Sequence, residues 1–311
     1  MIALLFPGQG SQAVGMGRDL YDVPAAREIF DTADETLSSP ITQLSFEGPE
    51  DTLTATENAQ PAILTQSTAL LAALAGSPKS ISDFVAKHAS FTVGHSLGEY
   101  SALVAAGALS FKTALRLVRR RGELMAASHD GGMAAVLGME AAALEELCAE
   151  ASQGEELVIA NYNAPGQLVI SGSAAAIKRA LHMAKNAGAK RAIPLKVSAA
   201  FHSPLMRRTA DALRGDLESA DIQDARVPVI ANVTGKPIQK AAEIRAELIT
   251  QVTTAVRWIE SVEHLAINGA TNFVEVGPGA VLTGLVKRIV PEAKLLNISK
   301  AADVQSFPPQ E

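Results

Sequence analysis

Cysteine is almost absent from this sequence, because Cys148 is the only one among 311 residues. A single thiol excludes an internal disulfide and any metal site built from several cysteines, and it predicts a reducing, cytoplasmic setting. Cys148 falls in a helical pattern beside Leu144 and Leu147, so we expect a small core residue without a chemical role. Histidines and carboxylates also lack metal-ligand spacing, and we expect no bound metal.

An excess of positive charge is lacking as well. The chain has 27 Lys and Arg against 33 Asp and Glu, a net charge of −6, whereas nucleic-acid binding requires clustered positive charge. The apolar opening Met1–Phe6 has no basic flank and stops at Pro7-Gly8, which makes it too short for a signal peptide or a membrane span. We therefore expect neither nucleic acid nor membrane as a partner. Hydrophobic residues, at 48%, still allow a sizeable core.

Both ends of the chain carry the pattern of a parallel α/β body. Ile2–Phe6 is a continuous apolar run that ends at a Gly-rich turn, which is typical of a strand covered on both faces. Segments with helical periodicity alternate with further short apolar runs. We expect strands at 91–93, 227–231 and 272–276, and helices at 25–37, 61–75, 99–109 and 110–126, from Pro204 onward, and around 244–265.

Residues 133–197 have their own pattern of predicted strands and helices and form a separate unit. The turn 163–166 between two apolar runs predicts a hairpin, and Gly188 is placed to end a helix. The order βαββαβ that results is the ferredoxin-like arrangement. Its strands are expected at 133–137, 157–161, 167–171 and 191–197, and its helices at 141–151 and 174–186. The fold class is therefore α/β, with a parallel-sheet body at 1–128 and 199–311 and an inserted ferredoxin-like subdomain at 129–198.

Ser96 stands in the pattern Gly94-His95-Ser96-Leu97-Gly98, between an apolar strand and a helix. Glycines permit a turn too tight for side chains, and such an elbow directs the serine hydroxyl outward at a helix N-terminus, where N–H groups favour an oxyanion. The five residues alone are equally compatible with a Gly-rich turn whose serine only caps the helix. The strand before and the helix after favour a catalytic Ser96.

A nucleophilic serine needs a base, and His202 has the best context among six histidines. It follows a predicted strand and precedes Ser203-Pro204, an N-cap and first-turn pair, so it lies at a strand-to-helix junction. His95 adjoins Ser96 but is expected to point the other way. The remaining histidines lie in polar loops or on helix faces, where a structural or solvated role is ordinary.

Arg121 is the most informative charge. In the predicted helix 110–126 it falls inside the apolar stripe made of Ala114, Leu117, Val118, Leu124 and Met125. An inward guanidinium keeps its proton and requires an anionic partner, most naturally a carboxylate in bidentate geometry. That partner is either an internal Asp or Glu, which is the more common arrangement, or the carboxylate of a substrate. Periodicity does not separate the two.

Five motifs occur together along the chain: residues 6–12 (FPGQGSQ), 94–99 (GHSLGE), 121–122 (RG), 200–203 (AFHS) and 275–279 (EVGPG). In this combination, and over nearly its whole length, the sequence closely resembles malonyl-CoA:acyl carrier protein transacylases. Acyltransferase domains of polyketide synthases and the malonyltransferase subunit of malonate decarboxylase share these motifs. The resemblance implies a hydrolase-like body with a ferredoxin-like insert.

The resemblance also implies roles for individual residues. Ser96 corresponds to the nucleophile and His202 to its general base, with the backbone carbonyl of Gln251 holding the histidine in place of an acid; the Gln251 side chain is not expected to matter. Arg121 corresponds to the residue that binds the malonyl carboxylate. Backbone N–H groups of Gln9 and Leu97 would form the oxyanion hole.

Further residues bear on the acyl group and the pocket. Asn161 and Asn163 resemble residues that line the pocket between the two subdomains. Phe201 before the histidine and Leu97 after the serine favour malonyl over methylmalonyl groups, since relatives that accept methylmalonyl have a smaller residue and a glutamine there.

The implied reaction transfers malonyl from malonyl-CoA to the phosphopantetheine thiol of acyl carrier protein in fatty acid biosynthesis. No cofactor is expected, because the CoA thioester is itself the substrate, and we expect a monomer. The alternatives are a stand-alone acyltransferase of a polyketide synthase, a malonate decarboxylase subunit, and a serine esterase or thioesterase. A non-catalytic scaffold subunit is disfavoured because Ser96, His202 and Arg121 are all present.

Overall fold

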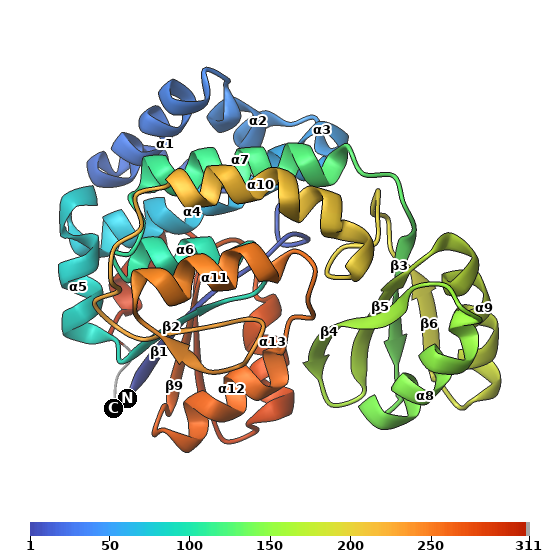
Figure 1. The fold of residues 1–311 in the computed structure, drawn as a ribbon. Helices are drawn as coiled ribbons and strands as arrows, with labels where there is room; N and C mark the ends of the chain where they lie inside the picture. The colour runs from blue at the N-terminus through green and yellow to red at the C-terminus, as the bar shows by residue number, and fades with distance from the viewer. Residues whose placement is uncertain (309–311) are drawn as a thin grey trace.

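The computed structural model describes residues 1–308, whose strands form two separate sheets (Figure 1). In the larger sheet the first strand of the chain, β1 (Ile2–Phe6), lies between β2 (Phe91–Gly94) and β9 (Asn272–Val276) and runs parallel to both. The strand order is β10-β9-β1-β2-β7-β8, where β10 (Lys294–Ile298) and β7 (Val229–Ile230) are also parallel and β8 (Pro237–Ile238) pairs antiparallel with β7.

Helices cover both faces of the larger sheet, and its strand β1 is apolar along its whole length. Leu4 and Phe6 belong to the core on one face and Ala3 and Leu5 to the core on the other, because successive side chains of a strand alternate. The second face is covered by α12 (Trp258–Ile267) and α13 (Val281–Ile289). The helices on the first face are α1 (Pro24–Leu37), α2 (Ile41–Glu47), α3 (Glu50–Thr54), α4 (Thr56–Ala75), α5 (Ile81–His88), α6 (Gly98–Ala105), α7 (Phe111–Ala126), α10 (Arg207–Ser219) and α11 (Ala241–Gln251).

None of the helices within residues 1–308 combines the length and the apolar character needed to cross a bilayer.

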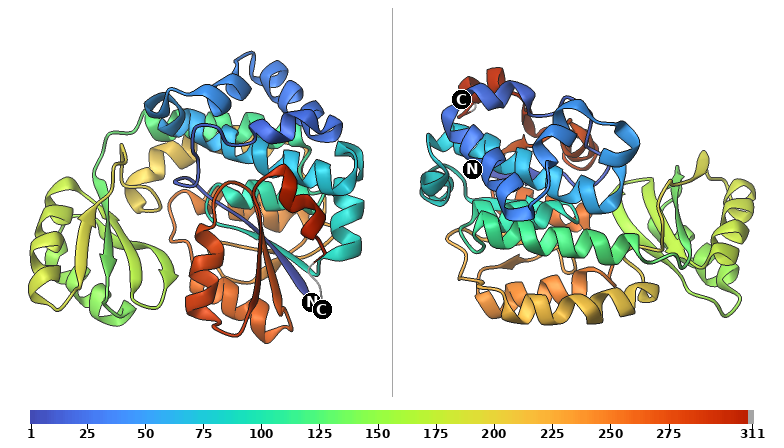
Figure 2. Two further views of the ribbon diagram at one scale, coloured as in Figure 1. Left: turned by 180° about the vertical axis from the view of Figure 1, so that it is seen from behind. Right: turned by 90° about the horizontal axis from the view of Figure 1, so that it is seen from above.

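The smaller sheet is antiparallel, and its strand order β4-β5-β3-β6 confirms the ferredoxin-like arrangement that the sequence predicted. Its strands are β3 (Gly132–Leu137), β4 (Leu157–Ala164), β5 (Gln167–Gly172) and β6 (Arg191–Pro194). The helices α8 (Ala141–Ser152) and α9 (Ala174–Asn186) lie on the side of this sheet that is turned away from the body (Figure 2). The subdomain limits 129 and 198 stay predictions.

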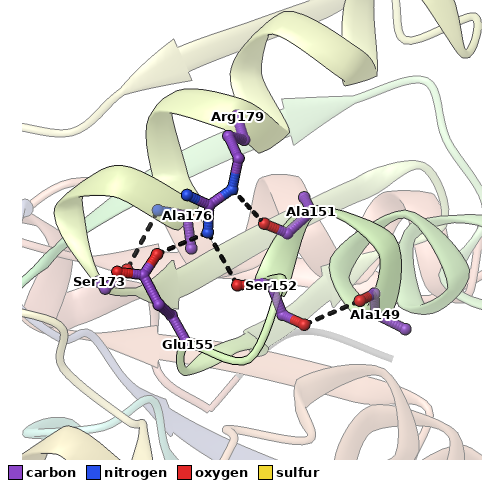
Figure 3. Close-up of polar contacts among 7 residues, drawn as sticks. All are labelled: Ala149, Ala151, Ser152, Glu155, Ser173, Ala176 and Arg179. Carbon is purple, nitrogen blue, oxygen red and sulfur yellow. Dashed lines mark hydrogen bonds and ion pairs between the residues drawn. The ribbon is translucent and has the colours of Figure 1, made fainter.

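Arg179 of α9 ties the two helices of the smaller unit together (Figure 3). Its Nε donates to the Ala151 carbonyl at 2.7 Å, and its Nη2 donates to the Ser152 carbonyl at 2.8 Å and to Glu155 at 2.5 Å. The last carbonyls of a helix lack partners inside the helix, and a cation there also meets the negative end of the helix dipole. Arg179 therefore caps α8 from its neighbour. At the same end of the pair, Ser173 caps α9 by accepting from Ala176 N–H at 3.1 Å (Figure 3).

The prediction of one helix around 244–265 is wrong. The helix α11 ends at Gln251, α12 begins at Trp258, and the residues between them run beside β4. Val256 N–H donates to the Ala160 carbonyl at 2.8 Å, and the Val256 carbonyl accepts from Tyr162 N–H at 2.9 Å. The β-branched run 252–254 weakens the helix locally, and this strand-like pairing with a distant segment replaces it. Carbonyl groups at the end of α11 are thereby left without helical partners.

Several predicted strand ends were also too long. The strand expected at 191–197 stops at Pro194, because proline has no N–H to donate to a ladder, and the strand expected at 227–231 is reduced to Val229–Ile230.

Gly122 lets α7 approach the first turn of α4 closely. A Cβ added at Gly122 would lie 2.8 Å from Glu57 Cα and 2.9 Å from the Thr56 carbonyl oxygen. Both contacts are with backbone, which does not rotate away as a side chain would. The approach brings Gln60, one turn further along α4, to the neighbouring Arg121.

We expect Gly122→Ala to reduce the free energy of unfolding by about 1–3 kcal/mol, because the two helices must move apart. Gly215→Ala is the matched control: it is also mid-helix, but its added Cβ would meet nothing within 4 Å, so we expect a gain of about 0.5–1 kcal/mol. Urea unfolding of both variants tests this. A Gly122→Ala midpoint at or above that of the parent would contradict the packing argument.

Candidate active site

The elbow at Ser96 is as tight as its glycines predict. Ser96 has φ 52°, in the left-handed region that is unfavourable for residues other than glycine. A Cβ at Gly94 would lie 1.9 Å from Gly98, and a Cβ at Gly98 would lie 2.0 Å from the Phe6 carbonyl oxygen. Side chains at these two positions are therefore excluded, and the turn holds the Ser96 hydroxyl at the start of α6.

His202 meets the serine as the sequence predicted. Its Nε2 is 2.8 Å from Ser96 Oγ, and its Nδ1 is 3.0 Å from the Gln251 carbonyl oxygen and 3.2 Å from that of Thr254. Two carbonyl acceptors at Nδ1 require the proton there, so Nε2 is the acceptor that faces the serine hydroxyl. Both carbonyls come from the break between α11 and α12.

Burial controls the protonation of this base. His202 is 5% exposed. Burial, followed by the positive charge of Arg121, lowers the pKa of His202 from 6.5 to about 3, although the carbonyl of Gln251 acts in the opposite direction. The imidazole is therefore neutral and able to accept a proton at neutral pH.

Arg121 lies in the floor of the site, 1% exposed, and its partners are neutral oxygens. Its Nη1 donates to Gln60 Oε1 at 2.7 Å, and its Nη2 donates to Gln251 Oε1 at 3.0 Å and to Ser96 Oγ at 3.1 Å. Within residues 1–308, no Asp or Glu oxygen lies within 4.0 Å of the guanidinium. An internal carboxylate partner, one of the two possibilities left open by the sequence, is therefore absent from the described part of the chain.

The Gln251 side chain has more contacts than the sequence suggested. Besides accepting from Arg121, it donates through Nε2 to the Ser96 carbonyl at 3.0 Å and to Glu99 Oε2 at 2.5 Å. The expectation that only its backbone matters is wrong, because one residue contacts the base, the nucleophile and the buried cation.

A cavity of about 300 Å³ opens over Ser96 between the two sheets. Gln9, Asn161 and Phe201, all expected at the site, contribute to its lining together with Arg121 and His202. Asn163 is not among the residues that line it. Its Oδ1 is instead 2.8 Å from Nε2 of His95, so Asn163 contacts the residue before the nucleophile.

At Leu97 and Gln9 the backbone N–H group, and not the side chain, is the candidate functional group. The Leu97 side chain is fully buried, and Gln9 Nε2 donates to Thr56 at 3.1 Å. Among the described residues, neither backbone N–H of this pair donates to a backbone carbonyl in a turn, loop or cap. Such free N–H groups next to Ser96 are what an oxyanion hole requires.

Three contacting residues were not identified from the sequence. Asn232 accepts from Ser96 N–H through Oδ1 at 2.7 Å and donates through Nδ2 to the Gly94 carbonyl at 2.7 Å, so it clamps the elbow from both sides. Its position directly after an apolar run at the carboxyl edge of the sheet was a usable signal. Gln60 and Glu99 had weaker signals, as polar residues in largely apolar helices.

A family model of the acyl transferase domain matches residues 3–307. The chain belongs to the acyl transferase family.

Relatives of this acyl transferase agree in length and name. It is 49% identical over 309 residues to the malonyl CoA-acyl carrier protein transacylase of Bacillus subtilis, covering 98% of this chain and 95% of that protein. The crystal structure of an acyl-carrier-protein S-malonyltransferase from Burkholderia pseudomallei is 41% identical and superposes with a TM-score of 0.92 over 98% of both chains. A malonyl-transacylase solved in complex with a type II polyketide acyl carrier protein is 39% identical, with a TM-score of 0.91 over 98% of each. The family resemblance inferred from the motifs is confirmed.

The lowered pKa of His202 predicts how the serine of this acyl transferase responds to acid. An imidazole with a pKa of 6.5 would be about 3% neutral at pH 5, and labelling of Ser96 by a fluorophosphonate would then slow about 30-fold between pH 8 and pH 5. With a pKa near 3 the neutral form persists, and we expect the labelling rate constant to stay nearly flat over this range. Ser96→Ala, which should not be labelled, is the control. A 30-fold decline would contradict the assignment.

Proposed function

We propose that this acyl transferase moves a malonyl group from malonyl-CoA to the phosphopantetheine thiol of an acyl carrier protein, through a malonyl ester on Ser96. The observation that carries the proposal is the buried guanidinium of Arg121, which lies 3.1 Å from the Ser96 hydroxyl and lacks a carboxylate partner in the described chain. The names of the full-length relatives support the same reaction.

The first half of the reaction forms the ester. Ser96 Oγ gives its proton to His202 Nε2 and attacks the thioester carbonyl, and the oxyanion that forms accepts from the N–H groups of Gln9 and Leu97. The C–S bond then breaks, and the proton on His202 passes to the leaving CoA sulfur. The imidazolium is stabilised by the Gln251 and Thr254 carbonyls, which act as dipoles where a hydrolase has an acid.

The second half returns the enzyme to its starting state. His202 accepts the proton of the carrier thiol, the sulfur attacks the ester carbonyl, and Ser96 leaves with the proton from His202. No step needs a cofactor, and we propose that none is used.

Selection of the acyl group follows from charge. The malonyl carboxylate would take the place beside Arg121 that no described carboxylate occupies, in the bidentate geometry that a guanidinium favours. An acetyl group would leave this cation buried without an anion, which disfavours it strongly. Phe201, which lines the cavity, supports malonyl over methylmalonyl groups, whereas the buried Leu97 side chain is not part of the lining.

Fatty acid synthesis is the pathway we propose, in the cytoplasm and with a monomeric enzyme. Three observations support this assignment: the net charge of the chain, its lone buried Cys148, and the full-length match to relatives named as malonyl CoA-acyl carrier protein transacylases. A polyketide carrier is the second candidate, because a similar structure holds a malonyl-transacylase together with one.

Incubation with malonyl-CoA followed by intact mass measurement tests the first half-reaction. We expect a single malonyl adduct that maps to Ser96, is absent from Ser96→Ala, and disappears when holo acyl carrier protein is added. An unmodified protein, or an adduct lost to water faster than to the carrier, would overturn the transferase assignment in favour of an esterase.

Replacement of Arg121 tests the selection of the acyl group. In Arg121→Ala we expect malonyl transfer to fall by about 100-fold or more in kcat/KM, whereas acetyl transfer should rise relative to malonyl, because a charge-assisted bidentate contact is lost. Arg120→Ala is the matched control, since this neighbour is half-exposed and pairs with Asp216 at 3.5 Å. Equal malonyl transfer in both variants would show that Arg121 does not bind the carboxylate.

A further inference from the structure

Glu99 is a fully buried carboxyl group that the reaction described above does not use. It lies three residues after Ser96 in α6, at 0% exposure. Each of its oxygens accepts from one N–H donor: Oε1 from the backbone of Asn232 at 3.2 Å, and Oε2 from the Gln251 side chain at 2.5 Å. Burial, and then nearby Glu247, raises the pKa of Glu99, while both donors and Arg121 act in the opposite direction. Donors on both oxygens are the contacts of the ionised form.

The Gln251 amide connects this carboxyl group to the guanidinium of Arg121. Its Nε2 faces Glu99 and its Oε1 faces Arg121 Nη2 at 3.0 Å. The opposite orientation of the amide would set an NH₂ group against the guanidinium and an oxygen against the carboxylate, so only one orientation is compatible with both neighbours. Glu99 therefore determines which end of the amide Arg121 meets.

The same carboxyl group fixes the peptide of the nucleophile. Gln251 Nε2 also donates to the Ser96 carbonyl, and Asn232, whose backbone contacts Glu99, accepts from Ser96 N–H. Both polar groups of Ser96, which is held at φ 52°, are thus bonded by the side-chain amides of two residues that Glu99 contacts. Strained backbone persists only where its surroundings determine it in this way.

We propose that Glu99 is a positioning residue for recognition of the malonyl carboxylate: through the Gln251 amide it holds the Arg121 guanidinium in the orientation that receives the substrate. This inference rests on the proposed function. Glu99 touches neither the acyl group nor the reacting atoms, so its effect is exerted entirely through Gln251 and Arg121.

The change Glu99→Gln isolates this role. Asn232 N–H and Gln251 Nε2 both need an acceptor at position 99, and a glutamine offers one oxygen and one NH₂ group where the carboxylate offers two oxygens. One of the two donors then faces an NH₂ group instead of an oxygen, and where this donor is Gln251 Nε2, the amide loses the acceptor that holds it against Arg121. Loss of one hydrogen bond to a charged group corresponds to about 10- to 100-fold in affinity.

Acylation of Ser96 by malonyl-CoA and by acetyl-CoA, measured for the intact protein, tests the proposal. We expect Glu99→Gln to raise KM for malonyl-CoA and to reduce the malonyl-to-acetyl ratio of kcat/KM by about 10- to 100-fold, with acetyl acylation far less affected. Glu247→Gln is the matched control: this glutamate is also buried, but its side chain accepts from Val233 N–H at 2.8 Å and, within residues 1–308, makes no hydrogen bond to the Gln251 side chain. We expect it to keep the parental ratio.

A ratio in Glu99→Gln equal to that of the parent would overturn the proposal, whether both rates stay intact or fall together, because a merely structural role would affect both acyl groups alike.

If Glu99→Gln does not fold, the exchange Glu99→Gln with Gln251→Glu decides instead. It pairs the two side chains again but removes the donor to the Ser96 carbonyl and puts the carboxylate on Arg121, so malonyl preference should vanish. A retained preference would refute the inference. Failure of the parent itself to form a malonyl adduct would refute the proposed function and not the role of Glu99.

Discussion

The buried guanidinium of Arg121 is the constraint around which this site is arranged. A cation that cannot shed its proton is costly to bury, and in most proteins a carboxylate from the same chain compensates it. Here two glutamine oxygens and the serine hydroxyl solvate it, so its charge is accommodated without being neutralised. Burial and then the positive charge of Arg121 lower the pKa of His202. The Gln251 side chain, which accepts from Arg121, also donates to the Ser96 carbonyl. Nucleophile, base and recognition of an anion are therefore parts of one electrostatic arrangement.

The sequence predicted the features that depend on local periodicity and on short motifs. The elbow, the inward face of Arg121 and the order of the smaller sheet each follow from a spacing of a few residues, and the structure contains all three. His202 also lies at a junction and meets the elbow as the sequence predicted, although the strand before it, β6, belongs to the smaller antiparallel sheet and not to the parallel body.

Features that depend on distant partners could not be predicted in the same way. The break after Gln251 exists because residues near Val256 pair with β4, nearly a hundred residues earlier, and no local pattern contains that partner. The orientation of the Gln251 amide depends on Glu99 and Arg121, each on another helix. The short strand β8 and the edge strand β10 likewise depend on the sheet they join, whereas α13 is amphipathic, with Leu282, Leu285 and Val286 on its buried face.

The central position of β1 has a consequence for the making of the protein. The first strand to be synthesised is flanked by β2 on one side and by β9 on the other, and β9 is some 270 residues away along the chain. Pairings at such separation form late and slowly, since the intervening chain must be closed into a loop first. The base, the clamp on the elbow and the amide that orients the cation also come from beyond residue 200. A nascent chain thus carries its serine long before it carries anything that activates it, and reactivity toward thioesters arises only with the completed sheet.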